Sequence, residues 1–167
     1  MGRFTWALDA RKVALGACIA VLSFAMLSSA EELREMRMIN GVCEPSSHIA
    51  EGPIGADLTK RQSRFFCDAA IIGFFGRSKT HTLVQFSEKG SHHGQIIGYA
   101  GDMPEGQNIL TVDHVYLTQA VATPVTKGYC KFFYKATRLS GISCGAKIDE
   151  GNRRTVPIIA FDVTPQQ

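Results

Sequence analysis

The chain has 167 residues, which is enough for one domain with a hydrophobic core and too few for two domains of ordinary size. Its composition, 45% hydrophobic and 20% charged, excludes a disordered tail, a collagen-like fibre and a protein with several membrane spans. The formal net charge of +3 is too small to predict a nucleic-acid partner, because phosphate binding requires a concentrated basic patch.

Residues 1–30 have the pattern of a secretory signal peptide. Basic residues precede an uncharged apolar run from Val13 to Leu27, and the small residues 28–30 follow it. We therefore expect cleavage after Ala30, with the mature chain in the periplasm or secreted and without a membrane span. Two alternatives stay open, because the apolar run can be retained as an anchor or Cys18 can be acylated.

Export determines how the cysteines are interpreted. Four of the five cysteines follow residue 30, and an even number in an oxidising compartment is typical of disulfides. Cys130 and Cys144 are equally far from Thr137, so a hairpin with its turn centred there places them opposite each other. Cys43 would then pair with Cys67. Four cysteines allow three connectivities, and this one is our prediction.

Residues 31–63 are predicted to form a short helix followed by a loop. The segment Glu31 to Met38 begins with two acidic residues, and Leu33 and Met36 share one helical face. Asparagine, proline, serine and glycine residues then interrupt any periodicity up to Asp57. Cys43 would tether this loop to the core.

Residues 64–167 are predicted to form an antiparallel β domain, so the fold class is mainly β, a small disulfide-linked barrel or sandwich. Polar and apolar residues alternate most clearly from Thr80 to Glu88. Residues 58–75 suit either a helix or a strand, and a strand is preferred for the second half because residues 76–79 suit a turn. Further strands are predicted at 94–101, 108–117, 128–137, 139–148 and 155–163.

No motif predicts a catalytic residue. Gly141 to Gly145 match the glycine spacing of a hydrolase nucleophile elbow around Ser143, but no histidine follows that serine. Asp113 and His114 are neighbours in a predicted strand, where consecutive side chains point to opposite faces. We therefore do not expect them to form an acid–base pair.

The candidates for a metal site are histidines, and no cofactor or metal is predicted from them. Zinc needs three or four converging ligands, and the sequence has no CxxC or HExxH spacing to supply them. The candidates are His81, His92, His93 and His114.

One predicted strand face combines basic and aromatic side chains. Lys127, Lys131, Phe133 and Lys135 alternate along the segment 128–137 and its flank. The face suits an anionic polymer or an acidic partner, although a solvated outer face of a sheet has the same pattern.

These features together predict an exported, non-enzymatic binding module that contacts a protein or an envelope component. Export, paired cysteines, a compact β pattern and the lack of a local catalytic motif support this hypothesis. Two alternatives stay open: a histidine-based metal-binding protein or hydrolase, and a structural subunit of an envelope complex. The sequence leaves the oligomeric state undecided.

Overall fold

The computed structural model describes residues 32–76, 78, 80–87, 95–118 and 121–165. Within these ranges the chain forms β-strands joined by turns and loops. The strands are β1 (Leu33–Cys43), β2 (His48–Pro53), β3 (Gln62–Arg64), β4 (Ala69–Phe75), β5 (His81–Ser87), β6 (Ile96–Asp102), β7 (Ile109–Tyr116), β8 (Ala122–Pro124), β9 (Lys127–Lys135), β10 (Arg138–Glu150) and β11 (Arg153–Val163). The predicted signal peptide, its predicted cleavage site and Cys18 lie outside the described residues.

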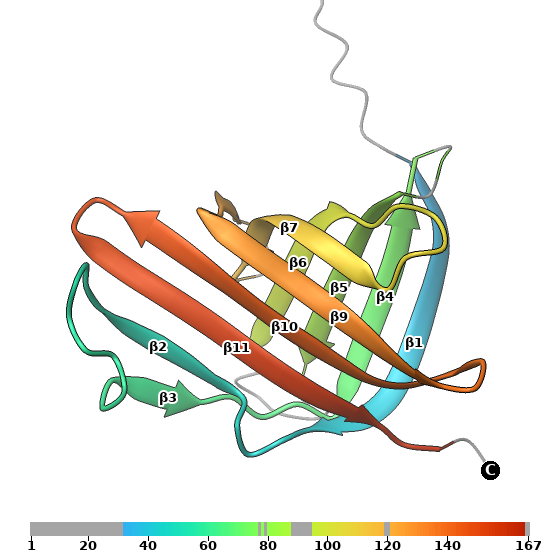
Figure 1. Cartoon of the computed structure of the whole chain (residues 1–167), viewed down its shortest axis with the longest axis horizontal. Helices are drawn as coiled ribbons and strands as arrows, with labels where there is room; N and C mark the ends of the chain where they lie inside the picture. Colours follow the sequence, from blue (N-terminus) through green and yellow to red (C-terminus); the bar gives the residue numbers. More distant parts are fainter. Residues whose placement is uncertain (1–31, 77, 79, 88–94, 119–120, 166–167) are drawn as a thin grey trace, which may run out of the picture. The chain divides into compact units, whose positions relative to one another are not determined.

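Eight strands close an antiparallel barrel, which decides between the predicted barrel and sandwich (Figure 1). Strands β4, β5, β6, β7, β9, β10 and β11 follow one another around the wall, and β1 closes it by pairing with both β4 and β11. Strand β2 also pairs with β11, and β3 extends the sheet from β2. The short β8 pairs with β7.

The core is built by alternation along the strands. In β5, Thr82, Val84 and Phe86 are buried and the residues between them are half-buried, as the sequence predicts. Burial of the larger side chains inside the barrel supplies the main favourable free energy of folding. The largest fully buried aromatic side chains are Phe65, Phe86, Tyr99, Phe132 and Phe161.

Both predicted disulfides are present. Cys130 on β9 lies directly opposite Cys144 on β10, with a Cα–Cα distance of 4.0 Å. The turn of this hairpin falls at Ala136 and Thr137, and a bulge between Leu139 and Gly141 restores the register that aligns the cysteines. The hairpin prediction therefore gave the correct partner although the turn is not centred on Thr137.

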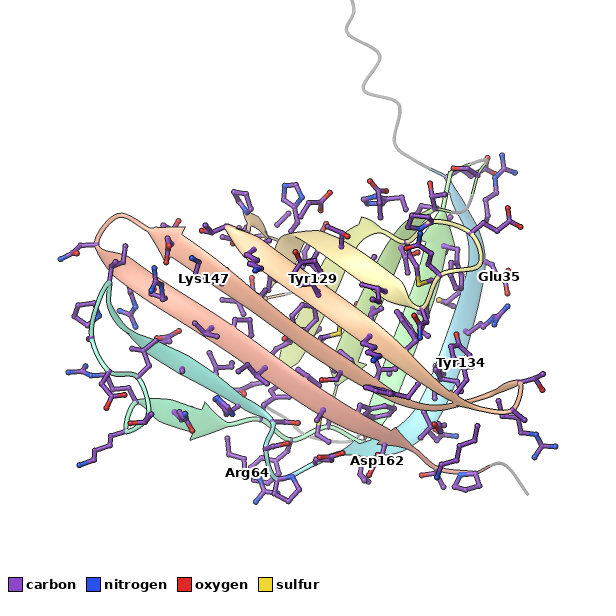
Figure 2. All side chains as sticks on the ribbon, viewed as in Figure 1. Glu35, Arg64, Tyr129, Tyr134, Lys147 and Asp162 are labelled. Atoms are coloured by element: carbon purple, nitrogen blue, oxygen red, sulfur yellow. A yellow bond between two sulfur atoms is a disulfide. The ribbon has the colours of Figure 1, made fainter. Side chains whose placement is uncertain are left out.

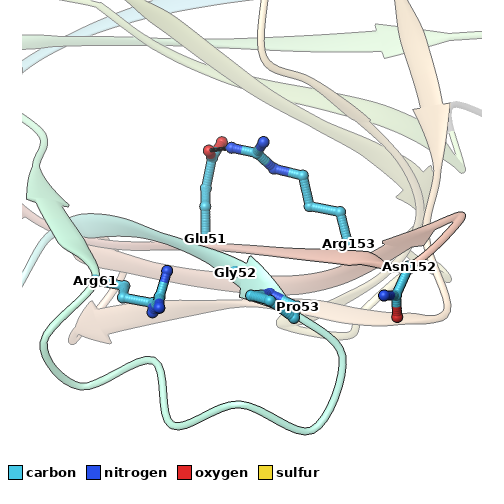
Figure 3. Close-up of a pocket in the computed structure, with 6 residues that line it drawn as sticks. All are labelled: Glu51, Gly52, Pro53, Arg61, Asn152 and Arg153. Carbon is cyan, nitrogen blue, oxygen red and sulfur yellow. Dashed lines mark hydrogen bonds and ion pairs between the residues drawn. The ribbon is translucent and has the colours of Figure 1, made fainter.

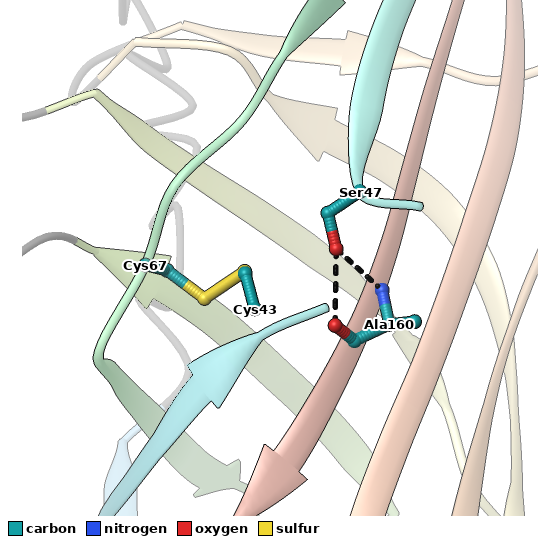
Figure 4. The surroundings of a disulfide bond; sticks show 4 residues. All are labelled: Cys43, Ser47, Cys67 and Ala160. Carbon is teal, nitrogen blue, oxygen red and sulfur yellow. Dashed lines mark hydrogen bonds between the residues drawn. A yellow bond between two sulfur atoms is a disulfide. The ribbon is translucent and has the colours of Figure 1, made fainter. Parts of the chain in front are cut away.

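The second disulfide lies beside the contact between β1 and β11, which we call the seam (Figure 4). Cys43, at the end of β1, is bonded to Cys67, which precedes β4. Fully buried Ser47 adds a second link, because its hydroxyl donates to the carbonyl of Ala160 and accepts from its N–H, both at 3.0 Å. The turn after β1 is thus fixed to β11.

The helix predicted within residues 31–63 is wrong in its described part, and the predicted loop is confirmed only at residues 44–47 and 54–61. Leu33 to Cys43 form strand β1, and residues 48–53 and 62–64 form β2 and β3. A two-turn helix is only marginally stable alone, whereas pairing with β4 satisfies the backbone of both strands. The helical spacing of Leu33 and Met36 was therefore misleading.

Candidate functional site

A cavity of about 1170 Å³, here called the end cavity, opens where the β9–β10 hairpin approaches β1. Its lining comes from β1, β4, β9, β10, β11 and the loop after β6. The buried side chains of Ile72 and Phe132 belong to the barrel core, so the cavity reaches that core. The other apolar lining residues are Met38, Ile39, Phe74, Met103, Tyr134, Leu139, Val163 and Pro165.

The end cavity exists because β11 ends before its two neighbours do. Strand β11 pairs with β10 only from Gly141 onward and with β1 only over Gly41–Cys43. Beyond Val163, the N–H of Thr164 still donates to the carbonyl of Asn40 at 2.9 Å, and Pro165 has no N–H to offer. The start of β10 and most of β1 therefore border an opening in the wall.

Three cationic side chains stand around this opening. Arg37 donates from Nε to Glu35 Oε1 at 2.7 Å, and its guanidinium lies 5.6 Å from the centre of the Phe74 ring. Within the described residues, Lys135 and Arg138 have no ion-pair partner.

The hairpin and β11 add a phenol and a carboxylate to the end cavity. Tyr134, near the end of β9, and Asp162, near the end of β11, both line it and are labelled in Figure 2. Asp162 is the single acidic side chain in the described lining. The lining thus combines apolar and polar surface in about equal parts, and its three cationic side chains outnumber its one carboxylate, which favours an anionic group.

Groups with shifted pKa values lie elsewhere in the described structure. Burial raises the pKa of Tyr99 well above its usual value. Hydrogen bonds from Arg154 lower the pKa of Asp149, and a backbone hydrogen bond from Thr59 lowers that of Asp57. The carboxylate of Asp149 in turn raises the pKa of Arg154. None of these residues lines the end cavity.

The predicted lysine and aromatic face is divided by the structure. Lys127, Lys131 and Phe133 point outward from β9, together with Tyr129, which the prediction omitted. Lys127 Nζ lies 5.8 Å from the centre of the Tyr129 ring, and Lys131 Nζ lies 5.3 Å from that of Phe133. Lys135 instead lines the end cavity, because it sits at the turn of the hairpin.

The predicted histidine candidates do not assemble in the described structure. His92 and His93 lie outside the described residues, and among the residues described no group of three or more potential metal ligands occurs. His81 contacts Asp102 at 3.4 Å. The expectation for Asp113 and His114 is wrong, because His114 Nδ1 lies 2.8 Å from Asp113 Oδ1. A register shift between β6 and β7 leaves Asp113 unpaired in the ladder and bends the strand there.

Two other candidate sites, Ser143 and a smaller pocket, have less support as functional sites. Ser143 lies within the regular strand β10, opposite Lys131, so residues 141–145 do not form a nucleophile elbow. A smaller pocket of about 350 Å³ lies beside β2 and the β10–β11 turn (Figure 3). Its Arg153 is already paired with Glu51, which removes much of its capacity to hold an anion.

Sequence reasoning missed most of the end cavity. Arg37 on β1, Phe74 on β4 and the hairpin residues around Arg138 are far apart in the chain, and only barrel closure brings them together. No protein-family model matches the sequence, and no curated protein or solved structure is significantly similar to it. The described residues contain no helix long and apolar enough to cross a membrane. The two disulfides are compatible with an oxidising extracellular compartment.

Proposed function

We propose that this protein is an exported, non-enzymatic binding module that holds an envelope component in the end cavity. The ligand class that fits best has an apolar body and an anionic end group, as a fatty acid or a similar amphipathic carboxylate has. The observation that carries the proposal is a cavity of about 1170 Å³ that reaches apolar side chains of the core and has cationic side chains in its lining. An eight-stranded barrel is wide enough to hold one small ligand.

In this proposal one group of residues contacts the apolar body of the ligand, and a second group binds its anionic end. Ile72 and Phe132 offer buried apolar surface to the body of the ligand, and Phe74 and Leu139 extend it toward the rim. A carboxylate at the rim can accept charge-assisted hydrogen bonds from the Lys135 ammonium and the Arg138 guanidinium. These hydrogen bonds would orient the ligand with its charged end outward.

A displacement titration tests this function. The anionic fluorescent probe 1-anilinonaphthalene-8-sulfonate is bound first, and dodecanoate or the neutral dodecanol is then added. We expect dodecanoate to displace the probe about tenfold more effectively than dodecanol, because charged hydrogen bonds are worth about 1.5–3 kcal/mol. Absence of probe binding, or equal displacement by the two compounds, would contradict the proposal.

Two double variants locate the charged end group. Changing Lys135→Gln and Arg138→Gln together should reduce the affinity for dodecanoate to that for dodecanol. The matched control is Lys127→Gln with Lys131→Gln, which removes two charges from the outer face of β9 and should leave both affinities unchanged. An equal loss in both double variants would show that net charge, and not the rim, attracts the carboxylate.

A further inference from the structure

Strand β1 has an open edge. Its pairing with β4 extends from Leu33 to Asn40, whereas its pairing with β11 covers only Gly41–Cys43. Within the described residues, the segment 36–39 thus has a strand partner on one side only. A strand edge of this kind presents unpaired backbone groups and is a template for another strand.

The direction of the backbone groups on this edge follows from neighbouring hydrogen bonds. The N–H groups of Gly41 and Cys43 donate toward the β4 side, to Asp68 at 3.2 Å and Cys67 at 2.8 Å. The carbonyl of Asn40 accepts from Thr164 on the opposite side. Because these directions alternate along an antiparallel strand, the N–H and C=O groups of Met36 and Met38 point to the open side.

The side chains on this edge make it attractive to an apolar partner. Met36 and Met38 are 60% and 63% exposed and share one face of β1, and Met38 also borders the end cavity. The residue between them, Arg37, projects to the other face, where it meets Glu35 and Phe74. The edge thus carries apolar residues on one face and a pair of opposite charges on the other.

We propose that β1 pairs with β1 of a second copy of this chain, antiparallel and about a two-fold axis at Met36. In this register Glu35 of each copy lies opposite Arg37 of the other, so two ion pairs form across the junction. The two Met36 residues face each other, and Met38 lies opposite Arg34 of the second copy. A two-fold junction of this kind uses the same surface on both copies.

Charge complementarity selects this register over its neighbours. An axis at Arg37 would place the two guanidinium groups opposite each other, and like charges in that position are destabilising. An axis at Met38 would place Arg37 opposite Ile39. It would also require Asn40 to pair with Met36 of the second copy, although the Asn40 carbonyl already accepts a hydrogen bond from Thr164. Pairing about Met36 ends at Met38 and leaves that bond intact. This inference goes beyond the proposed function, although the second copy would cover the β1 side of the end cavity.

Charge reversal tests the register in the absence of any ligand, so its outcome is independent of the proposed function. The chain is purified after export, and its mass is followed by sedimentation equilibrium over a concentration series. We expect a dimer that Glu35→Arg or Arg37→Glu weakens about tenfold or more, and that the two changes together restore to within about threefold. A monomer at every concentration, equal dimerisation in all four proteins, or no restoration in the double variant would overturn the proposal.

Cross-linking provides a second measurement at the axis. Met36→Cys places two thiols opposite each other, about 5.5 Å apart at Cα, which is within disulfide range. Met38→Cys is the matched control, because the proposed register separates its two thiols along the strands. We expect a covalent dimer only with Met36→Cys. Preferential linkage through Met38→Cys would overturn the register, and unchanged thermal unfolding of the reduced variants would show that both are folded.

Discussion

The two sides of β11 are closed in different ways. Toward β10, pairing runs from Gly141 opposite Asp162 to Glu150 opposite Arg153, and β10 is in turn disulfide-bonded to β9. Toward β1 there are three register pairs, after which the wall opens. The short side needs Cys43–Cys67 and Ser47 to hold it, and it borders the end cavity. The short pairing between β1 and β11 thus weakens the barrel wall and also leaves the opening that forms the end cavity.

Removal of either disulfide should have the largest effect on stability, and the two removals should differ in where the barrel opens. The cysteines are 24 residues apart at the seam and 14 apart in the hairpin, so chain entropy alone predicts a similar loss of about 3 kcal/mol for each. The difference should appear in local opening. Replacing Cys43 and Cys67 with alanine should speed hydrogen exchange throughout β1, whereas replacing Cys130 and Cys144 should lower global stability without a selective effect on β1. Equal exchange of β1 in the two variants would contradict this view of the seam.

Gly41→Ala should damage the seam next most severely. A Cβ at this position would collide with the carbonyl oxygen of Asp162 and approach the Phe161 ring at 2.5 Å. The two strands would have to separate, and we expect a loss of about 1–3 kcal/mol in urea unfolding. Gly145→Ala on β10 is the control, because its Cβ would meet only Ile158 at 3.9 Å. A similar loss in the control would show that any glycine in the wall is equally sensitive.

Tyr99→Phe should reveal a weakness in the fully closed part of the barrel. The Tyr99 hydroxyl is buried and has no hydrogen-bond partner among the described residues, so its removal should raise stability by about 1 kcal/mol. Burial raises the pKa of this phenol, whereas the unfolded chain ionises near pH 10.0. The wild-type protein should therefore lose stability as pH rises above that value, and the variant should lose less. Urea unfolding at pH 8 and pH 11 measures both effects, and identical pH dependence would refute the second.

Ala136→Gly should have the smallest effect, at the tip of the hairpin. Ala136 has a φ of +54°, a left-handed conformation that disfavours a side chain. Glycine should relieve that cost and stabilise the protein by up to about 1 kcal/mol, without changing the seam. Thermal unfolding measures the gain, and Thr137→Gly, at the adjacent turn residue, is the comparison. A gain confined to Thr137→Gly would contradict the explanation.

The closed side of the barrel was readily predicted from sequence, whereas the open side was not. Strands β5, β6, β7, β9, β10 and β11 coincide with predicted segments, because alternation and short turns leave a local signal. The pairing of Cys130 with Cys144 followed from their symmetry about one turn. Local patterns of this kind require no knowledge of distant partners.

Strand β1 and the end cavity depend on partners far away in the chain. The segment containing Glu35 and Arg37 has charges and methionines at spacings that also suit a helix, and only β4 and β11 select the strand. The end cavity depends on where β11 ends relative to its neighbours, a relation that no local pattern encodes. Asp113 was misjudged for a related reason, because a bulge changes the direction of a side chain without changing the residue types around it.

The seam also has a consequence for the order of assembly. It joins the earliest strand of the described chain to the latest one, so β1 must wait for β11 before the wall can close. Without that contact, a sheet of β4 to β10 would have two unpaired edges, and contacts this distant in sequence form slowly. Within the described chain, the barrel therefore cannot close before β11 is available to pair with β1.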